Sequence, residues 1–133
     1  MSGPYIGELQ SYARHNTSFR HVLFTARQMQ LVVMSLQPGE EIGTEVHEVD
    51  QLICIVEGEG RVVLDGEGAK VEKGMVVCVP AGVQHNVIAG KGEAMKLFTV
   101  YAPPEHAPGT IHETKAEAEA GELAGAMSEI AGR

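Results

Sequence analysis

The fold is decided by the stretch GEEIGTEVHEVDQLICIVEG, residues 39–58, in which a polar segment leads directly into the apolar run LICIV. A short run of apolar residues that ends near a glycine is typical of a buried strand. The same order of turn and strand continues in GMVVCVPAGVQH, residues 74–85. We therefore expect a protein built from many short strands joined by tight turns.

Turn signals continue along the central part of the chain at intervals of about eight to ten residues, which is the rhythm of a β-sandwich or barrel. The clearest hairpin turn is Asp65-Gly66. In the segment 94–101, strict alternation places the odd-numbered residues on one face of a strand and the even-numbered residues on the other. The expected strands are Phe19–Ala26, Gln28–Leu36, Gln51–Glu57, Arg61–Asp65, Ala69–Glu72, Met75–Val79, Val83–Ile88 and Ala94–Tyr101.

Length and charge narrow the class of protein. The 133 residues suffice for one domain with a single core. Eighteen acidic against ten basic residues give a net charge of −8, which argues against a nucleic-acid partner. The apolar runs are too short to span a membrane, and the first residues lack the apolar region of a signal peptide. Cys54 and Cys78 lie in apolar runs, so we expect buried, reduced thiols in a cytoplasmic protein.

The last thirty residues differ in character from the strands before them. Ala102-Pro103-Pro104 ends the final strand, because proline cannot donate to a strand ladder. Thr114 and Glu117 have the spacing of a capping box that opens a helix. We therefore expect one domain with a barrel core over 19–101 and a loop and short C-terminal helix over 102–133. The expected apolar stripe of that helix is Ala116, Ala120, Leu123, Met127 and Ile130.

Four polar residues stand out once the expected strands are assigned: Glu45, His47, Gln51 and His85. Glu45 and His47 are two apart, so on a strand their side chains point to the same side. A metal ion needs donor atoms that converge from different strands, and the interior of a β-barrel supplies that arrangement. Each of these residues taken singly would be ordinary solvated surface, and only their spacing favours a metal site. A barrel without metal and with a polar lining is the alternative.

The spacing of these residues resembles the first motif of the cupin family. That motif reads glycine, five residues, His-x-His, three or four residues, Glu, six residues, glycine. Here Gly39, Glu45, His47, Gln51 and Gly58 stand at the matching positions with the same spacers. The resemblance implies an all-β fold, a double-stranded β-helix or jelly-roll barrel.

The second cupin motif is similar as well. Gly74, five residues, Pro80-Ala81-Gly82, two residues and His85 follow its pattern, and Ala89 stands where asparagine is frequent. The segment 103–118, PPEHAPGTIHETKAEA, is also similar to small single-domain bacterial cupins that are often described as mannose-6-phosphate-isomerase-like. Fold alone does not decide the chemistry of so widely used a scaffold.

Two departures from the family pattern shape the expected metal site. Glutamate stands at the position of the first histidine, and glutamine stands at the position of the usual glutamate. The resemblance then implies Glu45, His47 and His85 as ligands of one divalent metal ion, with the Gln51 carbonyl oxygen as a weak fourth donor. Two histidines and one carboxylate suit Fe(II), and also Mn, Ni, Co or Zn.

From this ligand set we expect a small metalloenzyme, oxygenase-like or sugar-isomerase-like, that acts on a polar small molecule. Glu45 would double as a catalytic proton acceptor. The alternative is a cupin that binds a small molecule without catalysis. Because imidazole must be neutral to bind a metal, occupancy should fall below about pH 6.

The remaining expectations concern assembly and the other histidines. The apolar expected strands over 19–26 and 28–36 look too hydrophobic for a free edge, and cupins of this size commonly dimerise, so we expect a symmetric homodimer. The alternative is a monomer whose own N-terminal strands and helix cover its barrel. His15 and His21 are expected at the surface or in cross-strand contacts. His106 and His112 would shape a pocket only if their segment folds back across the barrel mouth.

Overall fold

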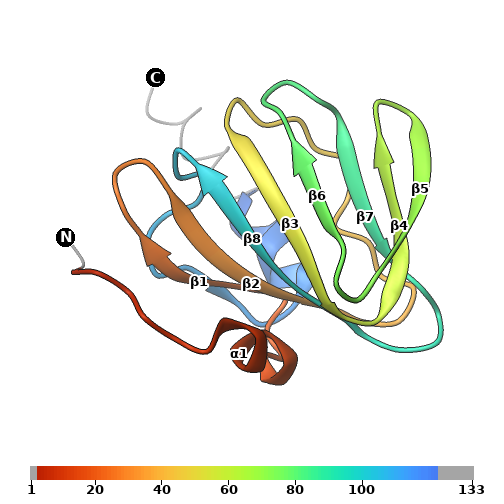
Figure 1. The fold of residues 1–133 in the computed structure, drawn as a ribbon, viewed down its shortest axis with the longest axis horizontal. Coiled ribbons are helices and arrows are strands. Elements are labelled where there is room, and N and C mark those ends of the chain that lie inside the picture. The colour runs from red at the N-terminus through yellow and green to blue at the C-terminus, as the bar shows by residue number, and fades with distance from the viewer. Residues whose placement is uncertain (1–2, 123–133) are drawn as a thin grey trace.

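The computed structural model describes residues 3–122, and in them two antiparallel sheets face each other (Figure 1). The larger sheet has the order β6-β3-β8-β2-β1-β9, and the smaller has the order β5-β4-β7. The strands are β1 (Arg20–Thr25), β2 (Gln30–Leu36), β3 (Asp50–Glu57), β4 (Glu59–Leu64), β5 (Glu67–Glu72), β6 (Val76–Val79), β7 (His85–Ala89), β8 (Met95–Ala102) and β9 (Ile111–His112).

The expected all-β jelly roll is confirmed, and the expected strands lie within a few residues of the observed ones. The Asp65-Gly66 hairpin between β4 and β5 is also confirmed. Asp65 and Gly66 have φ values of 48° and 85°, and positive φ at both central residues is what a type I′ turn requires. Leu64 and Glu67 close the ladder on either side of this turn.

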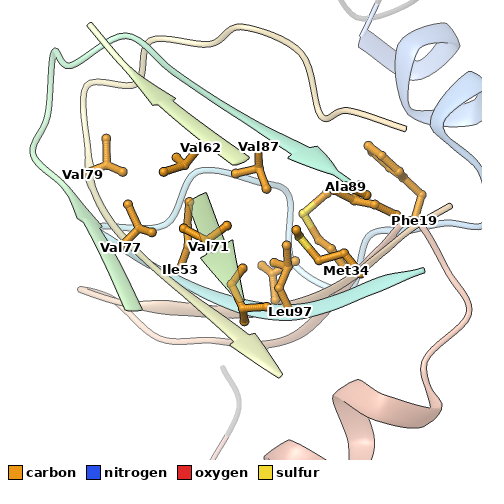
Figure 2. Packing of buried hydrophobic residues seen from close by; sticks show 14 of the residues in the cluster. Phe19, Met34, Ile53, Val62, Val71, Val77, Val79, Val87, Ala89 and Leu97 are labelled. Carbon is orange, nitrogen blue, oxygen red and sulfur yellow. The ribbon is translucent and has the colours of Figure 1, made fainter. Parts of the chain in front are cut away.

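The core lies between the two sheets, where side chains from both inner faces interdigitate (Figure 2). In β8, the inward-facing residues are Met95, Leu97, Thr99 and Tyr101, as the alternation in the sequence predicts. Two of these residues are apolar and two carry hydroxyl groups, so the character of the interior changes along β8. The apolar end is filled mainly by valines, isoleucines, leucines and methionines, and the other end holds the polar site.

A helix that the sequence did not indicate, α1 (Leu9–His15), covers part of the outer face of the larger sheet (Figure 1). It has no side-chain cap, so no capping signal marks its start. Its buried Ala13 packs with Val33 and Val56, and this tertiary contact holds a helix too short to be stable alone. Because Val33 is covered within its own chain, the apolar character of β2 no longer argues for a dimer. The homodimer stays a prediction.

The C-terminal helix begins at Lys115 and is described as far as residue 122. Thr114 accepts a hydrogen bond from the Glu117 backbone N–H at 3.1 Å, as the capping box predicts. The Glu117 carboxylate accepts instead from the Glu113 N–H, one residue earlier than a regular box requires. In the described part of this chain, no helix is long and apolar enough to cross a membrane.

The expected apolar stripe of this helix is wrong in its described part. Ala116 and Ala120 are exposed, and Ala118 is the residue that packs on the core. Alanine buries little apolar area, so its spacing orients a helix only weakly. Leu123, Met127 and Ile130 lie outside the described residues.

The prediction that both cysteines are buried is also wrong. Cys54 is half-buried and Cys78 is exposed, and both are free thiols. They alternate with the inward-facing Ile53, Val77 and Val79, so they lie on the outer face of the sheet. Each cysteine lies in a run whose residues are apolar on both faces of the strand, so the sequence pattern could not show which face is buried.

Alkylation of the native protein therefore separates the two thiols. We expect iodoacetamide to modify Cys78 readily and Cys54 slowly, because partial burial limits access and raises the pKa of the Cys54 thiol. Mass spectrometry of timed samples measures both rates. Equal rates at the two positions would contradict the burial described here.

Gly60 offers a test of how closely the sheets pack. A Cβ atom at this position would overlap the backbone oxygen of Ile88 and approach the Met95 methyl group to 2.6 Å. We expect Gly60→Ala to lower the free energy of unfolding by about 2 kcal/mol or more. Gly92→Ala is the matched control, because nothing lies within 4 Å of its added Cβ. Urea denaturation measures both, and equal stabilities would contradict the packing.

Candidate metal centre

The site begins with a backbone pairing between two distant parts of the chain. Glu45 and His85 form an isolated bridge in which each N–H donates to the other residue's carbonyl oxygen, at 2.8 and 2.9 Å. His85 opens β7, whereas Glu45 lies in the connection between β2 and β3. His47 follows two residues later, and its carbonyl accepts from Gly82 N–H at 2.8 Å. The two motif stretches are thus joined by backbone hydrogen bonds on both sides of the site.

The structure brings three of the four predicted donors together. One candidate ligand atom from each of Glu45, His47 and His85 lies within 4.8 Å of the other two. Glu45 Oε1 and His47 Nε2 are 3.7 Å apart, and the ring centroids of the two histidines are 5.1 Å apart. Both imidazoles are buried and the carboxylate is 27% exposed. The predicted same-side orientation of Glu45 and His47 is therefore confirmed.

Hydrogen bonds at the far ring nitrogens orient both imidazoles. His85 Nδ1 lies 2.9 Å from the Val83 carbonyl oxygen, and His47 Nδ1 lies 3.1 Å from the Glu105 carboxylate. Both partners are acceptors, so each Nδ1 carries a proton, and in the neutral form of each ring Nε2 presents a lone pair. Neither Nε2 has a hydrogen-bond partner among the described residues, although both are buried. Buried polar atoms are rarely left unpaired, and a metal ion would satisfy both.

Gln51, the fourth predicted donor, lies on β3 and is also buried. Its Nε2 donates to Thr99 Oγ1 at 3.0 Å, and its Oε1 has no partner in the described part of the chain. Gln51 pairs across the sheet with Tyr101, whose ring centroid is 5.8 Å from that of His47. This arrangement leaves a carbonyl oxygen free near the cluster. That it binds the metal stays a prediction.

Sequence reasoning missed Glu105, which comes from the loop after β8. Its backbone N–H donates to Gln30 Oε1 at 3.1 Å, and the N–H of His106 donates to the same oxygen at 2.9 Å. The Gln30 amide donates in turn to the His106 carbonyl at 2.7 Å. Gln30 is fully buried, so the loop is fixed on the barrel. No spacing in the sequence relates Glu105 to His47.

The loop does fold back over the end of the barrel, as the condition for His106 required. The His106 ring packs edge-on against the Tyr101 ring, with ring centroids 5.1 Å apart. Burial lowers the pKa of His106 to about 4, so this imidazole is neutral at pH 7. His112 lies 3.4 Å from the Arg20 guanidinium. His15 and His21 contact Ser11 and Tyr12 at the surface side of α1, as expected of them.

The charges in the site act on each other. Burial raises the pKa of the Glu45 carboxyl, but the contact with His47 and the charge of Arg20 outweigh it, so the pKa lies below its usual value. The Glu45 carboxylate raises the pKa of His47, burial opposes it, and Glu105 adds to the rise. Glu45 is therefore ionised at neutral pH, whereas a proton and a metal ion compete for His47.

These observations define the class of protein. It is a jelly-roll barrel with two histidines and one carboxylate at its polar end. Residues 32–101 match the Cupin domain family, and this chain belongs to that family. The match spans both motif stretches and every predicted metal ligand. The mannose-6-phosphate-isomerase-like subgroup stays a prediction.

Several known proteins are similar to this chain. The Bacillus subtilis protein YrkC is 39% identical over an alignment of 126 positions that covers 90% of this chain and 68% of the relative. The crystal structure of BH2720 from Bacillus halodurans is 36% identical, with a TM-score of 0.87 over 89% of this chain and 95% of that one. A salicylate 1,2-dioxygenase from Pseudaminobacter salicylatoxidans is 28% identical, with a TM-score of 0.53 over 56% of this chain and 21% of that one.

The contact between His47 and Glu105 generates a prediction about metal affinity. We expect Glu105→Gln to weaken metal binding by about tenfold or more, because such carboxylates orient the imidazole and raise its basicity. Competition with a fluorescent chelator for Co²⁺ or Zn²⁺ measures the affinity.

Glu48→Gln is the matched control, since Glu48 is exposed and adjacent to His47 in sequence. It removes the same charge from an exposed position and should leave the affinity unchanged. Equal affinities in both variants would show that Glu105 does not support the site.

Proposed function

We propose that this protein is a metal-dependent enzyme that acts on a polar small molecule at the barrel end. One observation carries the proposal: three buried atoms, His47 Nε2, His85 Nε2 and Gln51 Oε1, have no hydrogen-bond partner among the described residues. Each belongs to a side chain whose other polar atom is held by a neighbouring group. Buried polar atoms normally have a hydrogen-bond partner, so these three unpartnered atoms support the binding of a metal ion by them.

The donor set supports Fe(II) above the other divalent metals. Two histidines and one carboxylate with open positions form the set typical of non-haem Fe(II) oxygenases. When bound, the metal supplies a Lewis-acid and redox centre with positions free for substrate. The likeness to a salicylate 1,2-dioxygenase supports an oxygenase-like reaction over a sugar isomerisation.

The residues around the ligands have separate tasks. Glu45 is 27% exposed, so it is the ligand nearest to solvent and to an entering substrate, and we assign it a second role as proton acceptor. Tyr101 packs against both His47 and His106, which limits the access of water. Burial raises the pKa of the Tyr101 hydroxyl well above its usual value, so this group stays protonated and acts as a hydrogen-bond donor.

Loss of both imidazoles tests the assignment directly. We expect His47→Ala combined with His85→Ala to abolish stoichiometric metal while the far-ultraviolet circular dichroism of a β-protein is kept, because the apolar core between the sheets is untouched. Metal analysis of protein purified without chelator measures the content. His15→Ala with His21→Ala removes two imidazoles elsewhere and should retain the metal. Full retention in the first double variant would overturn the site.

The pH dependence follows from the raised pKa of His47. A group with a raised pKa keeps its proton to a higher pH, so protons displace the metal earlier than they would from an unperturbed histidine. Occupancy should therefore begin to fall at a higher pH than it would for a histidine with the ordinary pKa of about 6.5. Dialysis at stepped pH followed by metal analysis checks this, and full occupancy at pH 5 would contradict it.

A further inference from the structure

Arg20 is a buried arginine that the proposed metal chemistry does not use. It opens β1 and is only 3% exposed. It shares the inward face of that strand with the core residue Val22, and it pairs across the sheet with Met34, another core residue. The guanidinium therefore lies inside the barrel, where a charged group needs partners.

The partners of Arg20 do not balance its charge. Its Nη1 lies 3.4 Å from His112 Nδ1, and its Cζ lies 5.4 Å from the centre of the Phe19 ring. Its Nε has no hydrogen-bond partner among the described residues, and no carboxylate in that part of the chain lies within 4.0 Å of the guanidinium. A buried arginine without a carboxylate partner bears an uncompensated desolvation cost, which a bound anion would offset.

A cavity of about 210 Å³ is lined by Arg20 and by Glu45. The cavity therefore connects Arg20 with one of the candidate metal ligands. Lys115, Glu119 and Glu122 line it as well: Lys115 is paired with Glu119 at 3.9 Å, and both glutamates are exposed. Arg20 is therefore the buried cation of this cavity. At about 30 Å³ for each water-sized group, the cavity holds a molecule of about seven non-hydrogen atoms.

We propose that this cavity binds the carboxylate group of a small organic acid, with the Arg20 guanidinium as its anchor. The planar fork of arginine donates two parallel hydrogen bonds to a carboxylate, and Nε is one of the donors that such a fork uses. The rest of the acid then extends past Glu45 toward the two histidines. This part of the inference rests on the proposed function, whereas binding of the carboxylate to Arg20 does not.

Glu45 itself does not fill the role of that anion. Its carboxylate contacts His47 at 3.7 Å, and the charge of Arg20 reaches it only as a smaller influence on its pKa. Were Glu45 the partner of Arg20, the Nε donor would be satisfied by it. The vacant donor therefore indicates a group that comes from outside the described chain.

Calorimetric titration of glycolate and glycolamide tests this inference. The two probes have the same size and differ in charge, and each is added to metal-free protein and to protein loaded with Mn²⁺. We expect the wild-type protein to bind glycolate at least tenfold more tightly than glycolamide in both forms. Arg20→Gln should abolish that difference while it leaves the Mn²⁺ content unchanged. The control Arg61→Gln, at an exposed position on β4, should behave as wild type.

Arg20→Lys is the second variant, in case the glutamine variant does not fold. It keeps the charge and loses the fork, so its preference for glycolate should fall severalfold without disappearing. Equal binding of the two probes by wild type, or an undiminished preference in both Arg20 variants, would overturn the proposal. Methyl phosphate bound as tightly as glycolate would overturn the assignment to a carboxylate. If Mn²⁺ does not bind but the metal-free protein still selects glycolate through Arg20, the proposed function fails and the carboxylate site stands.

Discussion

The rest of the site depends on the backbone bridge between Glu45 and His85. Two hydrogen bonds of 2.8 and 2.9 Å join a connection after β2 to the first residue of β7, and they do so at one end of the space between the two sheets. The apolar layer of Figure 2 fills the remainder of that space. The polar side chains of Glu45, His47 and His85 come together beside this layer. The close approach of Gly60 on β4 to Met95 on β8 belongs to the same packing.

A second set of hydrogen bonds decides which atoms face the interior of the site. Gln30 holds the loop that carries Glu105, and Glu105 holds His47 by its Nδ1. Val83 does the same for His85, and Thr99 does so for Gln51. In each case one polar atom of the side chain has a partner and the other has none in the described residues. Orientation of this kind lowers the conformational entropy that a ligand must remove when it binds.

Much of this structure was predictable from local pattern, and the exceptions share a cause. Strands, the Asp65-Gly66 hairpin and the three donors of the metal cluster follow from turn chemistry, alternation and motif spacing. Glu105 and Arg20 did not, because their roles arise from tertiary contacts: a loop held by Gln30, and an arginine turned into the barrel. The helix α1 was missed because packing on Val33 stabilises it and no cap announces it. The cysteines were misplaced because a run such as LICIV is apolar on both faces of its strand.

The charges around the site are consistent with a metal and an acid that bind together. Glu45 and Glu105 contribute two negative charges, and His106 is neutral because burial lowers its pKa to about 4. Arg20 contributes one positive charge, so the metal-free site with neutral imidazoles carries one excess negative charge, which favours the proton on His47. A divalent ion replaces that proton and reverses the balance, leaving one excess positive charge inside a barrel of low polarity. A monocarboxylate on Arg20 neutralises that excess, and desolvation makes such compensation stronger than it would be in water. The metal should therefore increase affinity for the acid, and by thermodynamic linkage the acid should increase affinity for the metal by the same factor.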